Sequence, residues 1–161
     1  MTTPSLLSAS PLRLHGHRFT EVTMRASEQE KPQGGFSLST NRDLRAHSQE
    51  PSKFLLILTI ELGSNTPDQE SPYTARLTVE GEFEVSGTFK AGSPNDLVNV
   101  TGASMLYGAC REMLANLTAR STHGMSTLPS VSFASAKRVT SSAAKKKTVK
   151  KAAKKSTKRK G

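Results

Sequence analysis

The stretch Met105–Phe133, MLYGACREMLANLTARSTHGMSTLPSVSF, decides how the rest of the chain is interpreted. Its apolar side chains recur at the helical spacing i, i+4, i+7, i+8 and i+11, and they form one stripe: Leu106, Cys110, Met113, Leu114 and Leu117. We predict a helix over residues 104–120, followed by the turn Thr122-His123-Gly124 with glycine as the cap. An apolar clip, Leu128-Pro129-Ser130-Val131-Ser132-Phe133, comes next.

Upstream of the helix, residues 73–85 alternate strictly between apolar and polar side chains. This period of two over 13 residues predicts a strand with one dry and one wet face, as in an antiparallel sheet. Gly81 falls on the dry face, where we expect a bend or a close backbone contact. Gly108 lies inside the predicted helix at a cost of about 1 kcal/mol relative to alanine, which indicates a kink or a close helix contact.

Three further segments of the sequence predict strands. Residues 12–26 form one, with a bulge at His15-Gly16-His17. Residues 36–51 form a connection that contains only a short strand at Phe36–Leu38, and residues 54–62 form a strand whose first half is apolar on both sides and predicts two-sided burial. Three or four antiparallel strands followed by a helix make an α+β fold. One helix leaves apolar surface bare, so we expect copies of the chain to pair.

Charge divides the chain into two parts. Lys137–Gly161 holds 12 basic residues and no acidic one, which leaves 11 basic and all 13 acidic residues in positions 1–136, a net charge of −2. We therefore predict a disordered N-terminus over residues 1–11, one domain over 12–136, and a disordered lysine-rich tail over 137–161.

The cellular setting follows from cysteine content and hydropathy. The single cysteine, Cys110, cannot form a disulfide within the chain, which suits a reducing compartment. Residues 1–11 lack the charged and apolar regions of a secretory signal, and the longest apolar run, Phe54–Leu58, is too short to cross a bilayer. We expect a cytoplasmic protein without membrane insertion.

The order and spacing of these segments resemble the SecB family of export chaperones. Leu106-Tyr107-Gly108-Ala109-Cys110-Arg111-Glu112 is similar to the L-(F/Y)-P-Y-A-R-E run on the family's main helix. The clip Leu128–Phe133 is similar to the family's L-P-P-V-N-F segment, and residues 79–87, VEGEFEVSG, resemble the strand before the helix. The resemblance covers residues 12–133 and is specific in the last 50 or so.

This resemblance implies a four-stranded antiparallel sheet with a main helix packed on it, assembled as a dimer or a dimer of dimers. It also implies an ATP-independent holdase that binds non-native polypeptides, for protein export or for a toxin–antitoxin client. The sequence has no GxxxxGK[ST] motif, and we expect no cofactor, no metal and no enzymatic activity.

The chain departs from the SecB pattern in three places. Residues 134–142 cannot supply the family's second helix, and the tail is basic where the family's is short and often acidic. On the solvent-facing sheet, where the family carries acids that dock the export ATPase SecA, Glu21 keeps an acid but Arg25 and Arg76 do not. SecA is therefore a doubtful partner.

Candidate peptide-binding residues come from the apolar strand and helix positions: Leu12, Leu14, Leu56, Leu58, Tyr107 and Met113. For the helix stripe, a role in the core or in an oligomer interface is the favoured interpretation over a client groove. For Cys110, a small buried hydrophobe is favoured over a nucleophile. A bulge is the favoured interpretation of His15 and His17 over a metal site. A solvated strand face is favoured over paired catalytic carboxylates for Glu80, Glu82 and Glu84.

The tail supports a second function of another class. Its lysine clusters can neutralise phosphates without reading sequence, and the candidate polyanion-binding residues are Lys145, Lys146, Lys147, Lys150, Lys151, Lys154 and Lys155. The alternative to the holdase is thus a nucleoid-associated protein that binds nucleic acid non-specifically through its tail. A solubilising tail remains the simpler interpretation of the same lysines.

Overall fold

The protein is described by a computed structural model that places residues 9–134. Residues 1–8 and 135–161 lie outside the described residues, and with them most of the predicted N-terminal segment, the predicted lysine-rich tail and its seven candidate lysines.

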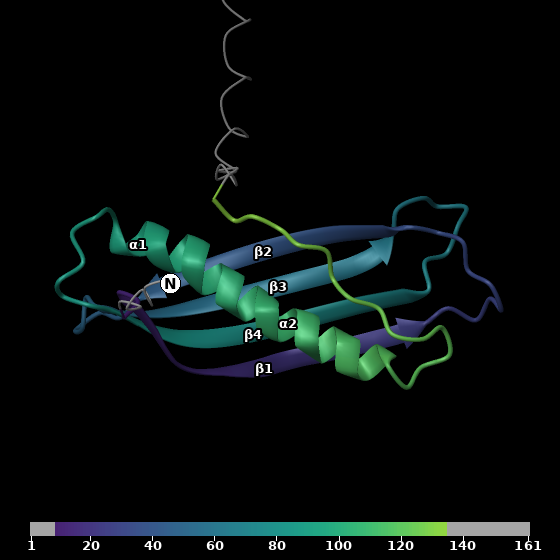
Figure 1. The fold of residues 1–161 in the computed structure, drawn as a ribbon, viewed down its shortest axis with the longest axis horizontal. Helices are drawn as coiled ribbons and strands as arrows, with labels where there is room; N and C mark the ends of the chain where they lie inside the picture. The colour runs from purple at the N-terminus through teal and green to yellow at the C-terminus, as the bar shows by residue number, and fades with distance from the viewer. Residues whose placement is uncertain (1–8, 135–161) are drawn as a thin grey trace, which may run out of the picture.

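Four strands form one antiparallel sheet: β1 (Leu12–Ala26), β2 (Phe36–Ala46), β3 (Lys53–Ser64) and β4 (Tyr73–Val85). Their order across the sheet is β1-β4-β3-β2, so β1 and β2 are the edge strands. One helical segment follows, made of the short helix α1 (Pro94–Leu97), the π-helical turn η1 (Val98–Gly102) and α2 (Ala103–Thr118). Figure 1 shows α2 lying diagonally across one face of the sheet. The predicted α+β fold, with four antiparallel strands and a helix packed on them, is confirmed.

Strand register determines which side chains face the helix. Residues directly opposite each other in an antiparallel pair share a face, and Leu58 pairs with Val79 while Ile60 pairs with Leu77. These side chains are buried under α2, where they meet Leu106, Cys110 and Leu114 of the predicted helix stripe. The core is thus one layer between the inner face of the sheet and the helix.

The edge strand β1 contains two bulges. The pairing with β4 shifts between Leu14 and Gly16 and again between Phe19 and Glu21. The first bulge confirms the one predicted at His15-Gly16-His17. Because each inserted residue reverses which parity faces the helix, Leu14, Phe19 and Val22 all lie on the inner face, opposite Phe83, Val79 and Leu77.

The prediction for residues 36–51 was wrong in extent. β2 runs over 11 residues and pairs with β3 along its whole length, whereas the sequence predicted only Phe36–Leu38. β2 is an edge strand with a single neighbour, and none of its residues is fully buried. Leu38 and Leu44 are separated by polar residues, which hide the alternation. The two-sided burial predicted for β3 is also absent from the protomer, because Leu55 and Ile57 are only half-buried on the outer face.

Two glycines differ in what surrounds them. A Cβ on Gly81 would lie 2.7 Å from Leu106 Cδ2 and 2.8 Å from Phe83 Cε2, so the predicted close contact is confirmed. A Cβ on Gly108 would meet nothing within 4 Å, so the contact predicted there is absent from the described protomer. Gly81 therefore permits α2 to approach the sheet, whereas Gly108 faces open space.

Alanine at these two positions is expected to have opposite effects on stability. Gly81→Ala forces Leu106 and Phe83, both buried, to repack, and we expect the free energy of unfolding to fall by about 1–3 kcal/mol. Gly108→Ala removes a flexible residue from an exposed helix position and should raise it by about 0.5–1 kcal/mol. Urea unfolding followed by circular dichroism measures both, and a Gly81→Ala variant as stable as the wild type would contradict the close approach.

Candidate peptide-binding surface

After α2 the chain turns back over the sheet. We call residues 121–134 the strap; Figure 1 shows that it returns on the β2 and β3 side of α2. The turn uses Gly124 at φ 75°, but the prediction that this glycine caps the helix was wrong, because α2 ends at Thr118 with Ala119 as its C-cap. Leu128 is 2% exposed and Phe133 is 6% exposed, while Val131 between them is 38% exposed. The predicted apolar clip therefore has two anchors in the core and one side chain toward solvent.

Three hydroxyl groups hold the backbone of the strap. Tyr73 Oη donates to Gly124 O at 2.7 Å, and Tyr107 Oη donates to Pro129 O at 2.7 Å. Thr118 Oγ1, at the end of α2, accepts from Ser126 N at 2.9 Å. Burial raises the pKa of Tyr107, so its hydroxyl remains a donor throughout the physiological pH range. These bonds fix the strap at three points along its length.

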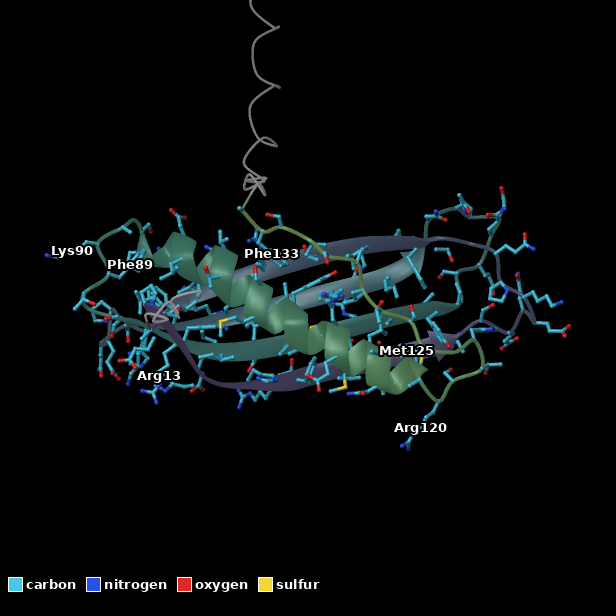
Figure 2. All side chains as sticks on the ribbon, viewed as in Figure 1. Arg13, Phe89, Lys90, Arg120, Met125 and Phe133 are labelled. Atoms are coloured by element: carbon cyan, nitrogen blue, oxygen red, sulfur yellow. The ribbon has the colours of Figure 1, made fainter. Side chains whose placement is uncertain are left out.

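An aromatic and cationic contact fixes the far end of the strap. The Arg42 guanidinium of β2 lies 5.1 Å from the centre of the Phe133 ring, and Tyr107 meets the same ring edge-on at 5.8 Å. Arg42 Nη1 also donates to the carbonyl oxygen of Asn99 in η1 at 2.8 Å. One charged side chain on the inner face therefore joins β2, η1 and the strap, as Figure 2 shows for Phe133 above β2.

The opposite flank of α2 is not covered by the strap. There the inner face of β1 and the adjoining side of α2 form a row of partly exposed apolar side chains, which we call the β1 strip: Leu14, Phe19, Val22, Met24, Met105 and Met113. Val22 is 40% exposed and Met105 is 41% exposed, and the other four are half-buried against the core. The helical period places Met105 and Met113 away from Tyr107, which faces the strap.

The six sequence-predicted peptide-binding residues divide into two groups. Leu14 and Met113 lie on the β1 strip, where a ligand can reach them. Leu12, Leu56, Leu58 and Tyr107 belong to the core of the protomer, and contact with a client would require the helix or the strap to move. Peptide binding by any of the six stays a prediction.

Sequence reasoning missed four members of the β1 strip. Phe19 was hidden because the two bulges change its parity relative to Leu14 and Val22. The first bulge carries a glycine that signals it, but the second, at Thr20, has no such signal. Val22 and Met24 lie on one face of the strand, as their predicted parity indicated, but they were not chosen as candidates. Met105 lies on the helix beside the predicted stripe, so a wider helical face would have included it.

The outer face of the sheet is lined with ion pairs. Arg76 Nε lies 3.0 Å from Glu21 and its Nη1 contacts Glu61, while Arg18 Nη2 lies 2.8 Å from Glu80. The hydrogen bond with Glu21 raises the pKa of Arg76. These pairs neutralise several of the acids of the outer face, including the one at Glu21 that the SecB resemblance singled out.

Two residues weighed as metal ligands lie apart. His15 is the bulged residue and its Nε2 contacts Glu84 Oε2 at 2.7 Å on the outer face. His17 pairs with Gly81 on the inner face and packs edge-on against Phe19, with 6.2 Å between ring centres. Within residues 9–134 no group of three or more His, Cys, Asp or Glu side chains is arranged to hold a metal ion.

Cys110 is fully buried beneath α2, as the sequence predicts. Burial raises the pKa of its thiol to about 12, so the thiolate that a nucleophile needs is absent at neutral pH. None of the helices within residues 9–134 has the length and apolar character required to span a membrane.

A solved structure shares this fold. The SecB-like chaperone Rv1957 of Mycobacterium tuberculosis, solved in complex with a ChAD peptide from the HigA1 antitoxin, superposes with a TM-score of 0.59 at 17% identity. The match covers 76% of this chain and 91% of that one. The chain has a SecB-like fold. No protein-family model and no curated protein matches the sequence.

A second solved structure is more distant from the SecB-like fold described here. A protein of unknown function from Streptococcus agalactiae matches at 11% identity with a TM-score of 0.43, over 76% of this chain and 99% of that one. A TM-score of that size is below the level at which a shared fold can be inferred.

The buried thiol provides a test of the core beneath α2. At pH 8, iodoacetamide should alkylate native Cys110 far more slowly than the unfolded chain, because the thiol is both inaccessible and protonated. Its folded-state pKa lies above the unfolded value, so this thiol's contribution to stability is present below about pH 9 and is lost as pH rises toward 12. Mass spectrometry of the alkylated chain measures the rate, and rapid native alkylation would contradict the packing.

Proposed function

We propose that this protein is an ATP-independent holdase that binds non-native polypeptides. Two observations support the proposal: the SecB-like fold and the β1 strip, in which six apolar side chains stay partly exposed beside the helix. The strip carries the argument, because apolar side chains gathered on a surface mark a place where another chain can bind.

The chemistry of the β1 strip suits many different clients. Burial of apolar area is non-directional and contributes about 25 cal/mol per Å², so it does not require a particular partner sequence. Four of the six side chains are methionines or a phenylalanine, and all four are partly exposed: Met24, Met105, Met113 and Phe19. Methionine is flexible and polarizable, and it adapts to ligands of differing shape.

The relative with the same fold supports a class of client. The Mycobacterium tuberculosis chaperone is solved with a peptide from an antitoxin, which supports an extended peptide as the ligand class proposed here. Clients from protein export or from a toxin–antitoxin pair both belong to this class. SecA is not proposed as a partner, because Arg76 pairs with Glu21 and Glu61 on the outer face and neutralises them.

Assembly into a dimer or a dimer of dimers belongs to the same proposal. Leu55 and Ile57 are half-buried on the outer face of β3, and pairing of copies would remove further apolar surface from water. Several strips on one particle would also bind one unfolded chain at several points, and such contacts add as avidity. We propose that this assembly acts in the cytoplasm.

A second candidate function rests on the lysine-rich segment that follows the domain. Residues 137–161 carry 12 basic residues and no acid, and such a segment binds phosphate backbones by releasing counterions. The alternative is a nucleoid-associated protein that binds nucleic acid non-specifically through this segment. It contains no aromatic side chain for base stacking, so sequence-specific recognition is not part of the proposal.

A charge placed on the β1 strip should weaken client binding. Val22→Asp puts a carboxylate on the inner face, and we expect the Kd for a reduced, carboxymethylated polypeptide to rise about three- to tenfold, since a desolvated apolar contact is lost. Thr23→Asp makes the same charge change one residue away, on the outer face of the same strand, and should leave the Kd unchanged. Fluorescence anisotropy measures both.

The comparison of the two aspartate variants decides whether the strip is the client surface. Equal Kd values for Val22→Asp, Thr23→Asp and the wild type would exclude the β1 strip as that surface. If Val22→Asp instead changes the mass of the native particle while client binding is retained, the strip is an interface between copies. A wild-type chain that fails to slow aggregation of an unfolded client at stoichiometric amounts would contradict the holdase itself.

Removing charge from the tail separates the two candidate functions. Glutamine at Lys145, Lys146, Lys147, Lys150, Lys151, Lys154 and Lys155 keeps the length of the chain and removes seven charges. We expect binding to duplex DNA to fall, and the slope of log K against log salt to become shallower by about 0.9 for each lost phosphate contact, while holdase activity is retained. A chain that only ever shows DNA binding would favour the nucleoid-associated alternative.

A further inference from the structure

The strap covers apolar surface of the same kind as the β1 strip. Arg42, which stacks on Phe133, lies opposite Leu58 in the pairing of β2 with β3, so Phe133 rests above this pair of strands. Leu58 and Ile60 are fully buried in the core that Leu128 and Phe133 complete. Leu38 and Leu44 of β2 remain half-buried at its border. An apolar floor therefore lies beneath the strap, on the flank opposite the β1 strip.

The strap is attached by side chains and not by sheet pairing. Its backbone–backbone hydrogen bonds lie in the turn, where Ser121 N donates to Thr118 O and Gly124 N donates to Ser121 O. Within the described part of the chain, no backbone–backbone hydrogen bond joins residues 125–134 to another element. What holds these residues are the hydroxyl contacts to Ser126 and Pro129 and two apolar anchors. A segment attached in this way opens more readily than a strand in the sheet.

We propose that the strap is a displaceable cover that occupies a second peptide-binding site of this protein. The occupant that replaces it is an extended segment of a non-native polypeptide with two large apolar side chains about five residues apart, the spacing of Leu128 and Phe133. The inference rests on the proposed holdase function and adds a site and its regulation to it.

The structure explains why such a client fits the site. The strap itself shows that an extended chain lies across the β2 and β3 side of α2, with two anchors inward and Val131 outward. Tyr107 Oη donates to a backbone carbonyl, a group that every client carries, so the contact does not depend on client sequence. Displacing the strap uncovers Tyr107, one of the residues predicted from the sequence as peptide contacts.

The closed strap lowers the apparent affinity of this site. When only a fraction of molecules is open, the apparent Kd equals the intrinsic Kd divided by that fraction. A change that weakens the closed state without touching the floor therefore tightens client binding. A merely structural strap would give the opposite result or none, because damage to the fold does not improve binding.

Phe133→Ala is the variant that tests this. It removes the strap's own anchor, the ring that contacts Arg42 and Tyr107, and leaves every side chain of the floor unchanged. The loss of this anchor raises the open fraction, and we expect the Kd for a reduced, carboxymethylated polypeptide to fall about three- to tenfold. Hydrogen exchange of the amides in residues 126–133 should become faster, while those of β3 and β4 stay protected. Val131→Ala, on the solvent side of the same segment, should change neither quantity.

A peptide with the strap's own sequence provides an independent test. The peptide STLPSVSFA, residues 126–134, should compete with the client for the Phe133→Ala protein, and the same peptide with alanine in place of Phe133 should not. Unchanged or weaker client binding by a folded Phe133→Ala protein, or equal competition by the two peptides, overturns the displaceable strap. The holdase proposal survives that result as long as the wild type binds the client and Val22→Asp weakens binding.

Discussion

One helix cannot cover four strands, and the remaining features of this protein follow from that geometric constraint. Strand axes about 4.8 Å apart make a four-stranded sheet wider than the 10–12 Å diameter of a helix with its side chains. Placed diagonally, α2 covers the two central strands and leaves both edge strands partly bare. Gly81 permits this packing, because without a Cβ it lets Leu106 lie directly against β4. The apolar side chains on each flank of the helix must then be covered by another segment or remain partly exposed.

The two flanks are solved differently. On the β2 side the chain returns as the strap, and polar groups that would be costly to bury unpaired are satisfied by Tyr73, Tyr107 and Thr118. No buried side-chain nitrogen or oxygen within the described residues lacks a partner. On the β1 side no segment of the described chain returns, and the apolar side chains remain partly exposed. The molecule therefore has one apolar flank covered by the strap and one partly exposed to solvent. A ligand could reach the exposed flank directly, but could reach the covered one only after the strap moves.

The sequence was a good guide wherever burial was strong and one-sided. The alternation over residues 73–85 predicted β4 at its observed bounds, and the helical stripe predicted α2 to within two residues at each end. It failed at β2, whose inner face carries Arg42 between Leu38 and Leu44 because the arginine serves Phe133 and Asn99. No pattern within residues 36–46 announces partners that lie more than 50 residues away.

The candidate surface was predicted only in part, for a similar reason. Leu14 and Met113 were found because local periodicity placed them on the apolar face, but periodicity cannot separate a covered residue from an uncovered one. Leu56 and Leu14 look alike in the sequence, and only the diagonal path of α2 buries the first and exposes the second. The ion pairs of the outer face likewise depend on register, which aligns Arg76 with Glu61 and brings Glu21 within reach.

The bulges in β1 have a consequence for the proposed holdase, which would meet unfolded chains. An uninterrupted edge strand offers a template on which a foreign chain can be added to the sheet and lead to fibrillar assembly. The two irregularities, at His15 and Thr20, break the spacing of the ladder along the edge that borders the open flank. A peptide on the proposed β1 strip would be held by burial of its apolar side chains and not by backbone pairing with the sheet, so it would depart without breaking a row of backbone hydrogen bonds.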